Sequence, residues 1–289
     1  MATESDPAQP GPLLPLAPQA VEQAPIVAEP PKPVVLLVDR LSKRYEDKVA
    51  VEGLSLTVHA GEILGLVGPN GAGKTTTLRS LVGVLPIKEG RVEICGFDLS
   101  SQEAAAKRCL AWVPDDPAPF DALTVWEHLE FTAALYSVRE WVPRAEELLA
   151  RFELTEKRDA LGGELSRGMR QKLAFCCAWL VRPRLVLLDE PLSGLDPRAI
   201  RYAKQAILDL AAEGSAVILS SHLLVLIEEL AHRILILDRG RRIFLGTLPE
   251  ARATLAPSPG SSLEEIFMAA TGRGADGVAA PPVVRERAS

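Results

Sequence analysis

The sequence of 289 residues predicts an α/β fold with an antiparallel β part and an inserted helical lobe. Two wholly apolar segments, Leu185–Leu188 and Ala216–Leu219, indicate strands that are covered on both faces, as in a parallel sheet. From about residue 117 to 181 the apolar residues recur at helical spacing, which predicts the lobe. The beginning of the chain alternates short apolar segments with Gly and charged turns, which predict strands at Val34–Val38, Val49–Val58, Ile63–Val67 and Arg91–Cys95.

A helix is predicted directly after the strand Ile63–Val67. Apolar residues recur at helical spacing over Thr75–Leu85, and Pro86 ends the pattern. This helix is expected to pack one face on the sheet. Within the lobe, helical patterns include Ala133–Tyr136 and Ala145–Phe152.

Two short elements close the predicted fold. Ile234–Leu237 and Ile243–Leu245, joined by a turn at residues 238–241, resemble a β-hairpin. Ser262, followed three residues later by Glu265, forms a capping-box pattern that starts a helix through Met268.

The composition is that of a globular protein, with 47% hydrophobic and 24% charged residues. Lys and Arg number 32 and Asp and Glu number 38, so the net charge is -6 and no nucleic-acid partner is expected. No apolar stretch approaches the roughly 18 to 20 residues that span a bilayer, so we expect no membrane span. The acidic start, with Glu4 and Asp6, is unlike the basic start of a secretory signal peptide.

Domain boundaries are predicted from the same composition. Residues 1–32 are rich in Pro and Ala and are expected to form a disordered tail, and residues 273–289 look similar. Residues 33–272 would then form one domain. The four cysteines, at positions 95, 109, 176 and 177, lack metal-ligand or disulfide-framework spacing and are expected to be reduced thiols.

A glycine-rich segment has the pattern G-x-x-x-x-G-K-T between a predicted strand and a predicted helix, the context that a phosphate-binding loop (P-loop) requires. Its glycines permit backbone angles that a Cβ would obstruct, so that N–H groups point at a triphosphate. Lys74 is placed to reach the β and γ phosphate oxygens, and Thr75 to offer its hydroxyl to Mg²⁺. An ordinary Gly-rich turn would need the Lys-Thr pair and both flanking elements to arise by accident. The segment predicts a P-loop NTPase core whose ATP-binding residues are Gly68, Pro69, Asn70, Gly71, Ala72, Gly73, Lys74, Thr75 and Thr76.

A second group of candidate residues follows the strand Leu185–Leu188. Asp189 and Glu190 stand at its carboxyl end, where ligands bind in open α/β sheets. Asp189 suits a Mg²⁺ ligand, and Glu190 suits a general base that polarises an attacking water. Alone, an Asp-Glu-Pro turn after a buried strand is common. Together with the phosphate-binding loop, a catalytic pair is the better interpretation.

The segment LSRGMRQ, at residues 165–171, resembles the signature of ATP-binding-cassette (ABC) proteins. Ser166 is expected to cap a helix, so that its hydroxyl and the following N–H groups form an anion site. In isolation the segment would be interpreted as a plain N-cap followed by Gly, but the flanking motifs stand in the order of the family. The resemblance implies that Ser166, Gly168 and Met169 contact the ATP of a partner subunit. Gly168-Met169, where the family usually has Gly-Gln, looks like bacterial exporters with separate membrane subunits.

Three further positions match the same family. By this resemblance Tyr45 stacks on adenine, Asp196 lies in a segment that touches the partner subunit, and His222 is a catalytic residue that senses the γ-phosphate. Taken alone, they would be interpreted as a surface tyrosine, a turn residue and a structural histidine.

One position departs from the family. Where the family usually has Gln, in the loop that joins the core to the lobe, this chain has Asp115. An Asp can ligate Mg²⁺ through oxygen, but it adds negative charge near the γ-phosphate and lacks the N–H donors of an amide. Asp115 is therefore a candidate metal ligand whose charge would alter hydrolysis.

The resemblance covers about residues 34 to 272 and implies the ATP-binding subunit of an ABC transporter, which hydrolyses ATP with Mg²⁺. Two such subunits would close head-to-tail around ATP and drive separate integral-membrane permease subunits, with export favoured over import. The chain would then be cytoplasmic and held at the inner face of the membrane by its permease.

Three alternatives stay open. The first is a soluble cassette ATPase acting on ribosomes or DNA, although such relatives usually carry a second cassette or a coiled-coil insertion. The second is a regulatory subunit that binds ATP with weak hydrolysis, which the charge of Asp115 motivates. The third is a small-molecule phosphotransferase, which the signature disfavours.

Overall fold

The computed structural model describes residues 32–46, 48–258 and 260–272. The tails predicted at 1–32 and 273–289 lie outside these residues, except for Lys32. Within the described ranges, none of the helices combines the length and the apolar character that a bilayer crossing requires.

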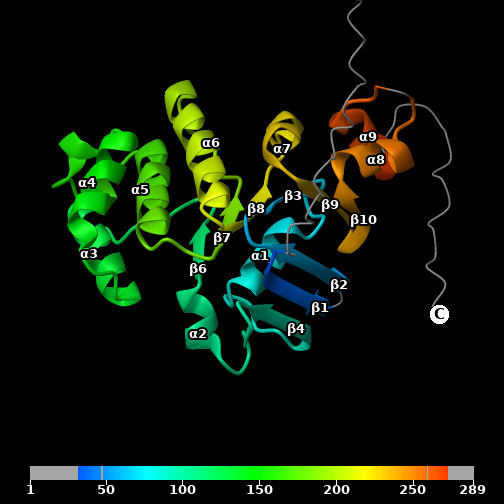
Figure 1. The fold of residues 1–289 in the computed structure, drawn as a ribbon, viewed down its shortest axis with the longest axis horizontal. Coiled ribbons are helices and arrows are strands. Elements are labelled where there is room, and N and C mark those ends of the chain that lie inside the picture. The colour runs from blue at the N-terminus through cyan, green and yellow to red at the C-terminus, as the bar shows by residue number, and fades with distance from the viewer. Residues whose placement is uncertain (1–31, 47, 259, 273–289) are drawn as a thin grey trace, which may run out of the picture. The chain divides into compact units, whose positions relative to one another are not determined.

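Two sheets form the centre of the fold (Figure 1). The first is antiparallel, in the order β2-β1-β4-β5, and consists of β1 (Val34–Tyr45), β2 (Lys48–His59), β4 (Glu89–Ile94) and β5 (Phe97–Asp98). The second has the order β10-β9-β3-β8-β7-β6 and is parallel except that β10 pairs antiparallel with β9. Its strands are β3 (Ile63–Val67), β6 (Leu110–Val113), β7 (Leu185–Asp189), β8 (Ala216–Ser220), β9 (Arg233–Asp238) and β10 (Arg241–Thr247). The antiparallel β part and the mainly parallel sheet are both confirmed.

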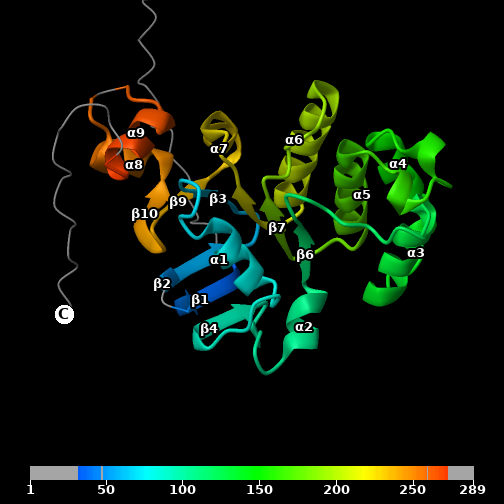
Figure 2. The same cartoon turned by 180° about the vertical axis from the view of Figure 1, so that it is seen from behind.

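Helices pack against both faces of the larger sheet. They are α1 (Lys74–Leu81), α2 (Glu103–Arg108), α3 (Val125–Tyr136), α4 (Trp141–Arg151), α5 (Arg167–Leu180), α6 (Pro197–Ala212), α7 (Leu224–Leu230), α8 (Leu248–Leu255) and α9 (Leu263–Ala270). Figures 1 and 2 show that α3, α4 and α5 cluster beyond β6, whereas α8 and α9 lie beside β9 and β10. The cluster of α3, α4 and α5 is the predicted helical lobe.

The larger sheet lies between two hydrophobic cores. On β3, Leu64 and Leu66 belong to the core shared with the antiparallel sheet and α1, while Ile63 and Val67 belong to the core shared with the lobe and α6. Alternate residues of a strand point to opposite faces, so both faces of this sheet are covered. This explains why the sequences of its central strands are wholly apolar.

Two predicted helix ends can be compared directly with the structure. Helix α1 ends at Leu81, four residues earlier than predicted, because Gly83 takes a left-handed conformation with φ 72° directly after the C-cap residue Val82. Helix α9 starts after Ser262 as predicted. The Ser262 hydroxyl accepts from Glu265 N at 3.3 Å, and the Glu265 carboxylate accepts from Ser262 N at 2.9 Å.

All four cysteines lie within the described residues and are free thiols. Burial raises the pKa of Cys95 to about 11, and the neighbouring Cys109 thiol adds to the rise. Burial also raises the pKa of Cys177 to about 11. Since the thiolate is the reactive form, these two thiols are weak nucleophiles at neutral pH.

Candidate nucleotide-binding and catalytic site

Glycines shape the loop between β3 and α1, for two different reasons. Gly71 and Gly73 have positive φ angles of 80° and 107°, which residues with a side chain rarely adopt. Gly68 does not have a positive φ. A Cβ at Gly68 would instead lie 2.6 Å from the carbonyl oxygen of Leu237, so the backbones approach too closely for any other residue. The expectation that backbone angle explains all three glycines is therefore wrong for Gly68.

Lys74 is the first residue of α1 and is nearly buried, with 9% of its surface exposed. Its ammonium donates to the carbonyl oxygens of Gly68 at 2.6 Å and Pro69 at 3.4 Å. Burial lowers its pKa, and the negative charges of Glu190 and Asp189 oppose that effect. An ammonium has three N–H donors, so it can hold the loop carbonyls and a phosphate oxygen together.

A cavity of about 380 Å³ opens above this loop. It gathers side chains from the end of β1, the start of β2, the end of β7, the start of α1 and the loop after β6. Its lining consists of Tyr45, Lys48, Ala50, Pro69, Asn70, Gly71, Gly73, Lys74, Thr75, Thr76, Asp115, Asp189 and Glu190. The structure thus brings together most of the residues predicted to bind ATP or Mg²⁺. Lys48 and Ala50 were not predicted.

Asp189 is buried at the carboxyl end of β7, with 3% of its surface exposed. Its Oδ1 accepts a hydrogen bond from the Ser220 hydroxyl at 2.9 Å. Ser220 ends β8 and is paired with Asp189 in the parallel register of β7 and β8. The sequence did not single out Ser220, because its role depends on which strands are neighbours.

Glu190 follows Asp189 with φ 46°, a left-handed conformation. Its carboxylate oxygen Oε2 accepts from His222 N at 3.1 Å and lies 2.7 Å from Nδ1 of the His222 ring. Two residues predicted to be catalytic, 32 positions apart, are therefore in direct contact. A left-handed φ in a residue other than Gly, Asn or Asp is uncommon and is often found at functional sites.

Mg²⁺ in phosphoryl-transfer sites is usually held by one or two carboxylates together with phosphates, a hydroxyl and waters. Asp189 and Thr75 both line the cavity and supply a carboxylate and a hydroxyl. Across the described ranges, no three His, Cys, Asp or Glu side chains gather as a complete cage for an ion. With the phosphates of a nucleotide, the Asp189 carboxylate and the Thr75 hydroxyl fit a Mg²⁺ site of this kind.

Asp115 lines the same cavity, but its carboxylate is paired with Arg167 across 3.3 Å. Arg167 is the first residue of α5 and belongs to the signature segment. The loop after β6 is therefore connected to the helical lobe by an ion pair that the sequence did not predict.

The signature residues and Asp196 lie outside the lining of this cavity. Ser166 caps α5 and accepts from Met169 N at 3.3 Å, as predicted; Ser166 and Arg167 are exposed, and Gly168 and Met169 are partly exposed. Asp196 caps α6: its Oδ1 accepts from Ala199 N at 2.8 Å. The hydrogen bond from Ala199 N contributes most to lowering the pKa of Asp196, and Lys172, 3.2 Å away, contributes further.

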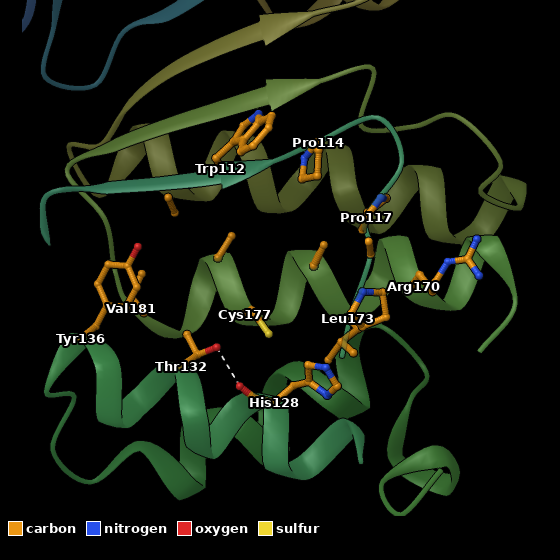
Figure 3. Close-up of a pocket in the computed structure, with 15 residues that line it drawn as sticks. Trp112, Pro114, Pro117, His128, Thr132, Tyr136, Arg170, Leu173, Cys177 and Val181 are labelled. Atoms are coloured by element: carbon orange, nitrogen blue, oxygen red, sulfur yellow. Dashed lines mark hydrogen bonds between the residues drawn. The ribbon is translucent and has the colours of Figure 1, made fainter. Parts of the chain in front are cut away.

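A separate groove of about 280 Å³ lies between β6 with its following loop and the helices α3 and α5 (Figure 3). Most of its lining is small or apolar. Its residues are Ala111, Trp112, Pro114, Pro117, Ala118, Pro119, His128, Thr132, Tyr136, Arg170, Leu173, Ala174, Cys177, Ala178 and Val181. The ring of Phe120 lies 6.0 Å from that of His128 in this lining and 5.7 Å from that of Phe131; Phe120 and Phe131 are 59% and 48% exposed.

The fold and this site define a nucleotide-binding protein of the P-loop class. Comparison with known proteins refines that statement. Residues 51–193 match the family model described as ABC transporter. The chain is 37% identical over 209 residues to a Nod factor export ATP-binding protein I of Burkholderia pseudomallei, a match that covers 72% of this chain and 69% of that protein.

Two further comparisons agree. The chain is 35% identical over 220 residues to the lipopolysaccharide export system ATP-binding protein LptB of Haemophilus influenzae, covering 74% of this chain and 90% of that protein. A solved structure of the ATP binding subunit of an ABC transporter superposes with a TM-score of 0.79 at 33% identity, covering 82% of this chain and 99% of that one. The chain therefore belongs to the ABC transporter family and is one of its ATP-binding subunits.

Proposed function

We propose that this chain is the Mg²⁺-dependent ATPase subunit that drives export through a separate membrane permease. The observation that carries the proposal is the position of Glu190. It lines the cavity above the phosphate-binding loop, and His222 binds its carboxylate at 2.7 Å. A carboxylate held in this way beside a phosphate site is suited to act on a water molecule.

In the proposed reaction, water attacks the γ-phosphorus of ATP and the bond between that phosphorus and the β–γ bridging oxygen breaks. Glu190 accepts a proton from the attacking water, and the products are ADP and inorganic phosphate. Lys74 and the loop N–H groups bind the phosphates, while His222 holds the Glu190 carboxylate in place. Asp189 and Thr75 would hold Mg²⁺, which when bound neutralises charge on the phosphates.

Two copies of the chain, or this chain and a similar subunit, would close head-to-tail around two ATP molecules. The exposed N-terminus of α5 supports this arrangement, because its Ser166 hydroxyl and first N–H groups favour an anion. The same residues do not line the cavity of their own chain. They are thus available to the phosphates of a partner, and Asp196 would lie at the same interface.

The groove between β6, α3 and α5 is the proposed contact with the permease. Its apolar lining and the exposed rings of Phe120 and Phe131 suit one amphipathic helix of a membrane protein. The loop that carries Asp115 borders both this groove and the nucleotide cavity, since Pro114 lines the first and Asp115 the second. Because one loop borders both sites, nucleotide binding in the cavity would alter the contact with the permease.

Export is proposed because both of the named bacterial relatives are described as export proteins. Through its permease the chain would be held at the cytoplasmic face of the membrane. The transported substrate would be selected by the permease.

ATP hydrolysis by the purified chain tests the enzymatic part. Phosphate release should require Mg²⁺ and should be lost in Lys74→Ala, because the phosphates lose their buried cation. Glu190→Gln should bind ATP with unchanged affinity but hydrolyse it slowly. Equal turnover in the wild type and Glu190→Gln would show that Glu190 is not the base.

Copurification from detergent-solubilised membranes tests the partner. A membrane-spanning protein should copurify with the wild type and be lost in Ala174→Glu, which places a charge in the groove. Leu208→Glu, which introduces the same charge at an exposed position of α6, is the control. Loss of the partner in both variants, or in neither, would refute docking in this groove, provided that both variants still bind ATP.

A further inference from the structure

Arg167 connects two loops that approach the nucleotide cavity. Its Nη2 lies 3.3 Å from Oδ1 of Asp115 and also donates to the Ser193 hydroxyl at 3.3 Å. Asp115 lies in the loop after β6, and Ser193 lies in the loop between β7 and α6. One guanidinium thus bridges a residue of the cavity lining and the loop that leads to Asp196.

The backbone around Arg167 is tightly packed. A Cβ at Gly168 would lie 3.0 Å from the carbonyl oxygen of Gly194, and a Cβ at Gly194 would lie 3.5 Å from Cδ of Arg167. The buried side chain of Gln171 donates to the carbonyl oxygen of Pro191 at 3.1 Å. The start of α5 and the loop after β7 are therefore held together, so the backbone that carries the Arg167 side chain is fixed relative to this loop.

We infer that Arg167 is a positioning residue that controls Asp115. In the nucleotide-free protein it holds the Asp115 carboxylate and neutralises it. When MgATP binds, the ion attracts the same carboxylate, so Arg167 and the bound metal compete for Asp115. This inference rests on the proposed function, since it assumes that the cavity takes ATP with Mg²⁺.

The sign of the effect depends on the metal. With Mg²⁺ present, loss of Arg167 frees the carboxylate for the ion and removes a competing state, so ATP binding tightens. Without Mg²⁺, loss of Arg167 leaves an unneutralised carboxylate facing the phosphates, so ATP binding weakens. A role for Arg167 in folding alone would change both affinities in the same direction.

The size of the effect follows from exposure. The side chains of Arg167 and Asp115 are 50% and 51% exposed, so solvent screens the pair. Pairs of this kind change an equilibrium constant by about 1.5-fold to fivefold. We expect Arg167→Gln to tighten ATP binding by roughly two- to fivefold in Mg²⁺ and to weaken it in EDTA.

Calorimetric titration of ATP into the full chain tests the inference, with Glu190→Gln in every variant to stop turnover. The four proteins of a double-mutant cycle are compared: the parent, Arg167→Gln, Asp115→Asn and the double variant, each in Mg²⁺ and in EDTA. When Asp115→Asn is already present, Arg167→Gln should have no metal-dependent effect. Arg167→Lys keeps the charge and should behave like the parent. It also provides the comparison if the Gln variant unfolds.

Arg170→Gln is the matched control. Arg170 lies one turn along α5 and is paired with Asp116 across 3.8 Å, a carboxylate outside the cavity lining. It should leave both affinities unchanged. The inference is overturned if Arg167→Gln changes affinity equally in Mg²⁺ and EDTA, or equally with and without the Asp115→Asn change. Absence of any Mg²⁺-dependent ATP binding in the parent would instead refute the proposed function.

Discussion

Replacing Gly71 and Gly73 with Ala, one at a time, separates two physical demands of the phosphate-binding loop. Both glycines have positive φ, so an alanine at either position is strained by about 1–2 kcal/mol. A Cβ at Gly71 meets nothing within 4 Å, whereas a Cβ at Gly73 would lie 2.4 Å from the carbonyl oxygen of Ala50. Overpacking of this kind adds about 1–3 kcal/mol. Gly73→Ala should therefore be the less stable variant by that amount.

Thermal unfolding without nucleotide measures this difference. One kcal/mol corresponds to about 2–4 °C in a domain of this size, so Gly73→Ala should unfold roughly 2–12 °C below Gly71→Ala. Although Gly71→Ala should destabilise the fold less than Gly73→Ala, it should still weaken ATP binding. Gly71 lines the cavity, and its new methyl group would stand where phosphate is expected, so Gly71→Ala should lose about tenfold in affinity. Equal melting temperatures would refute the close contact between Gly73 and Ala50.

Two other variants test buried and exposed oxygens of the site. Ser220→Ala removes the hydroxyl that donates to buried Asp189 and should destabilise the protein by about 1–3 kcal/mol in urea unfolding. Asp196→Ala should lower the urea midpoint at pH 7, while Asp196→Asn, which keeps an oxygen acceptor, should lower it less. Because the folded-state pKa of Asp196 lies below its ordinary value of 3.8, the charge stabilises the fold above that value. The difference between the wild type and Asp196→Asn should therefore vanish as the pH falls through the folded-state pKa. A difference that persists in acid would contradict this.

Local signals in the sequence predicted the local structure well. The strand, glycine-rich loop and helix around Lys74, the cap at Ser166 and the capping box at Ser262 all depend on residues a few positions apart. Helix α6 begins with a similar local signal, the Asp196 N-cap followed by Pro197 at the first helical position. Strand β6 has four residues, too few for a periodic pattern to show.

Contacts between distant segments could not be predicted in the same way. Asp189 meets Ser220 because β8 lies beside β7, and strand order is set by the packing of the whole sheet. Asp115 meets Arg167 because the lobe folds back onto the loop after β6, across 52 positions of sequence. Each of these contacts depends on tertiary structure that no local pattern contains.

Gly240, in the turn between β9 and β10, supports the phosphate-binding loop, and this contact bears on when the loop can fold during synthesis. Its N–H donates to the carbonyl oxygen of Ala72 at 2.9 Å, and its own carbonyl accepts from Glu52 N at 2.8 Å. A Cβ there would lie 2.8 Å from the carbonyl oxygen of Ala50. The phosphate-binding loop is thus supported by a hairpin that leaves the ribosome long after the loop itself. A nascent chain that stops short of this hairpin contains the whole glycine-rich motif without its support, so the capacity to hold ATP should arise only late in synthesis.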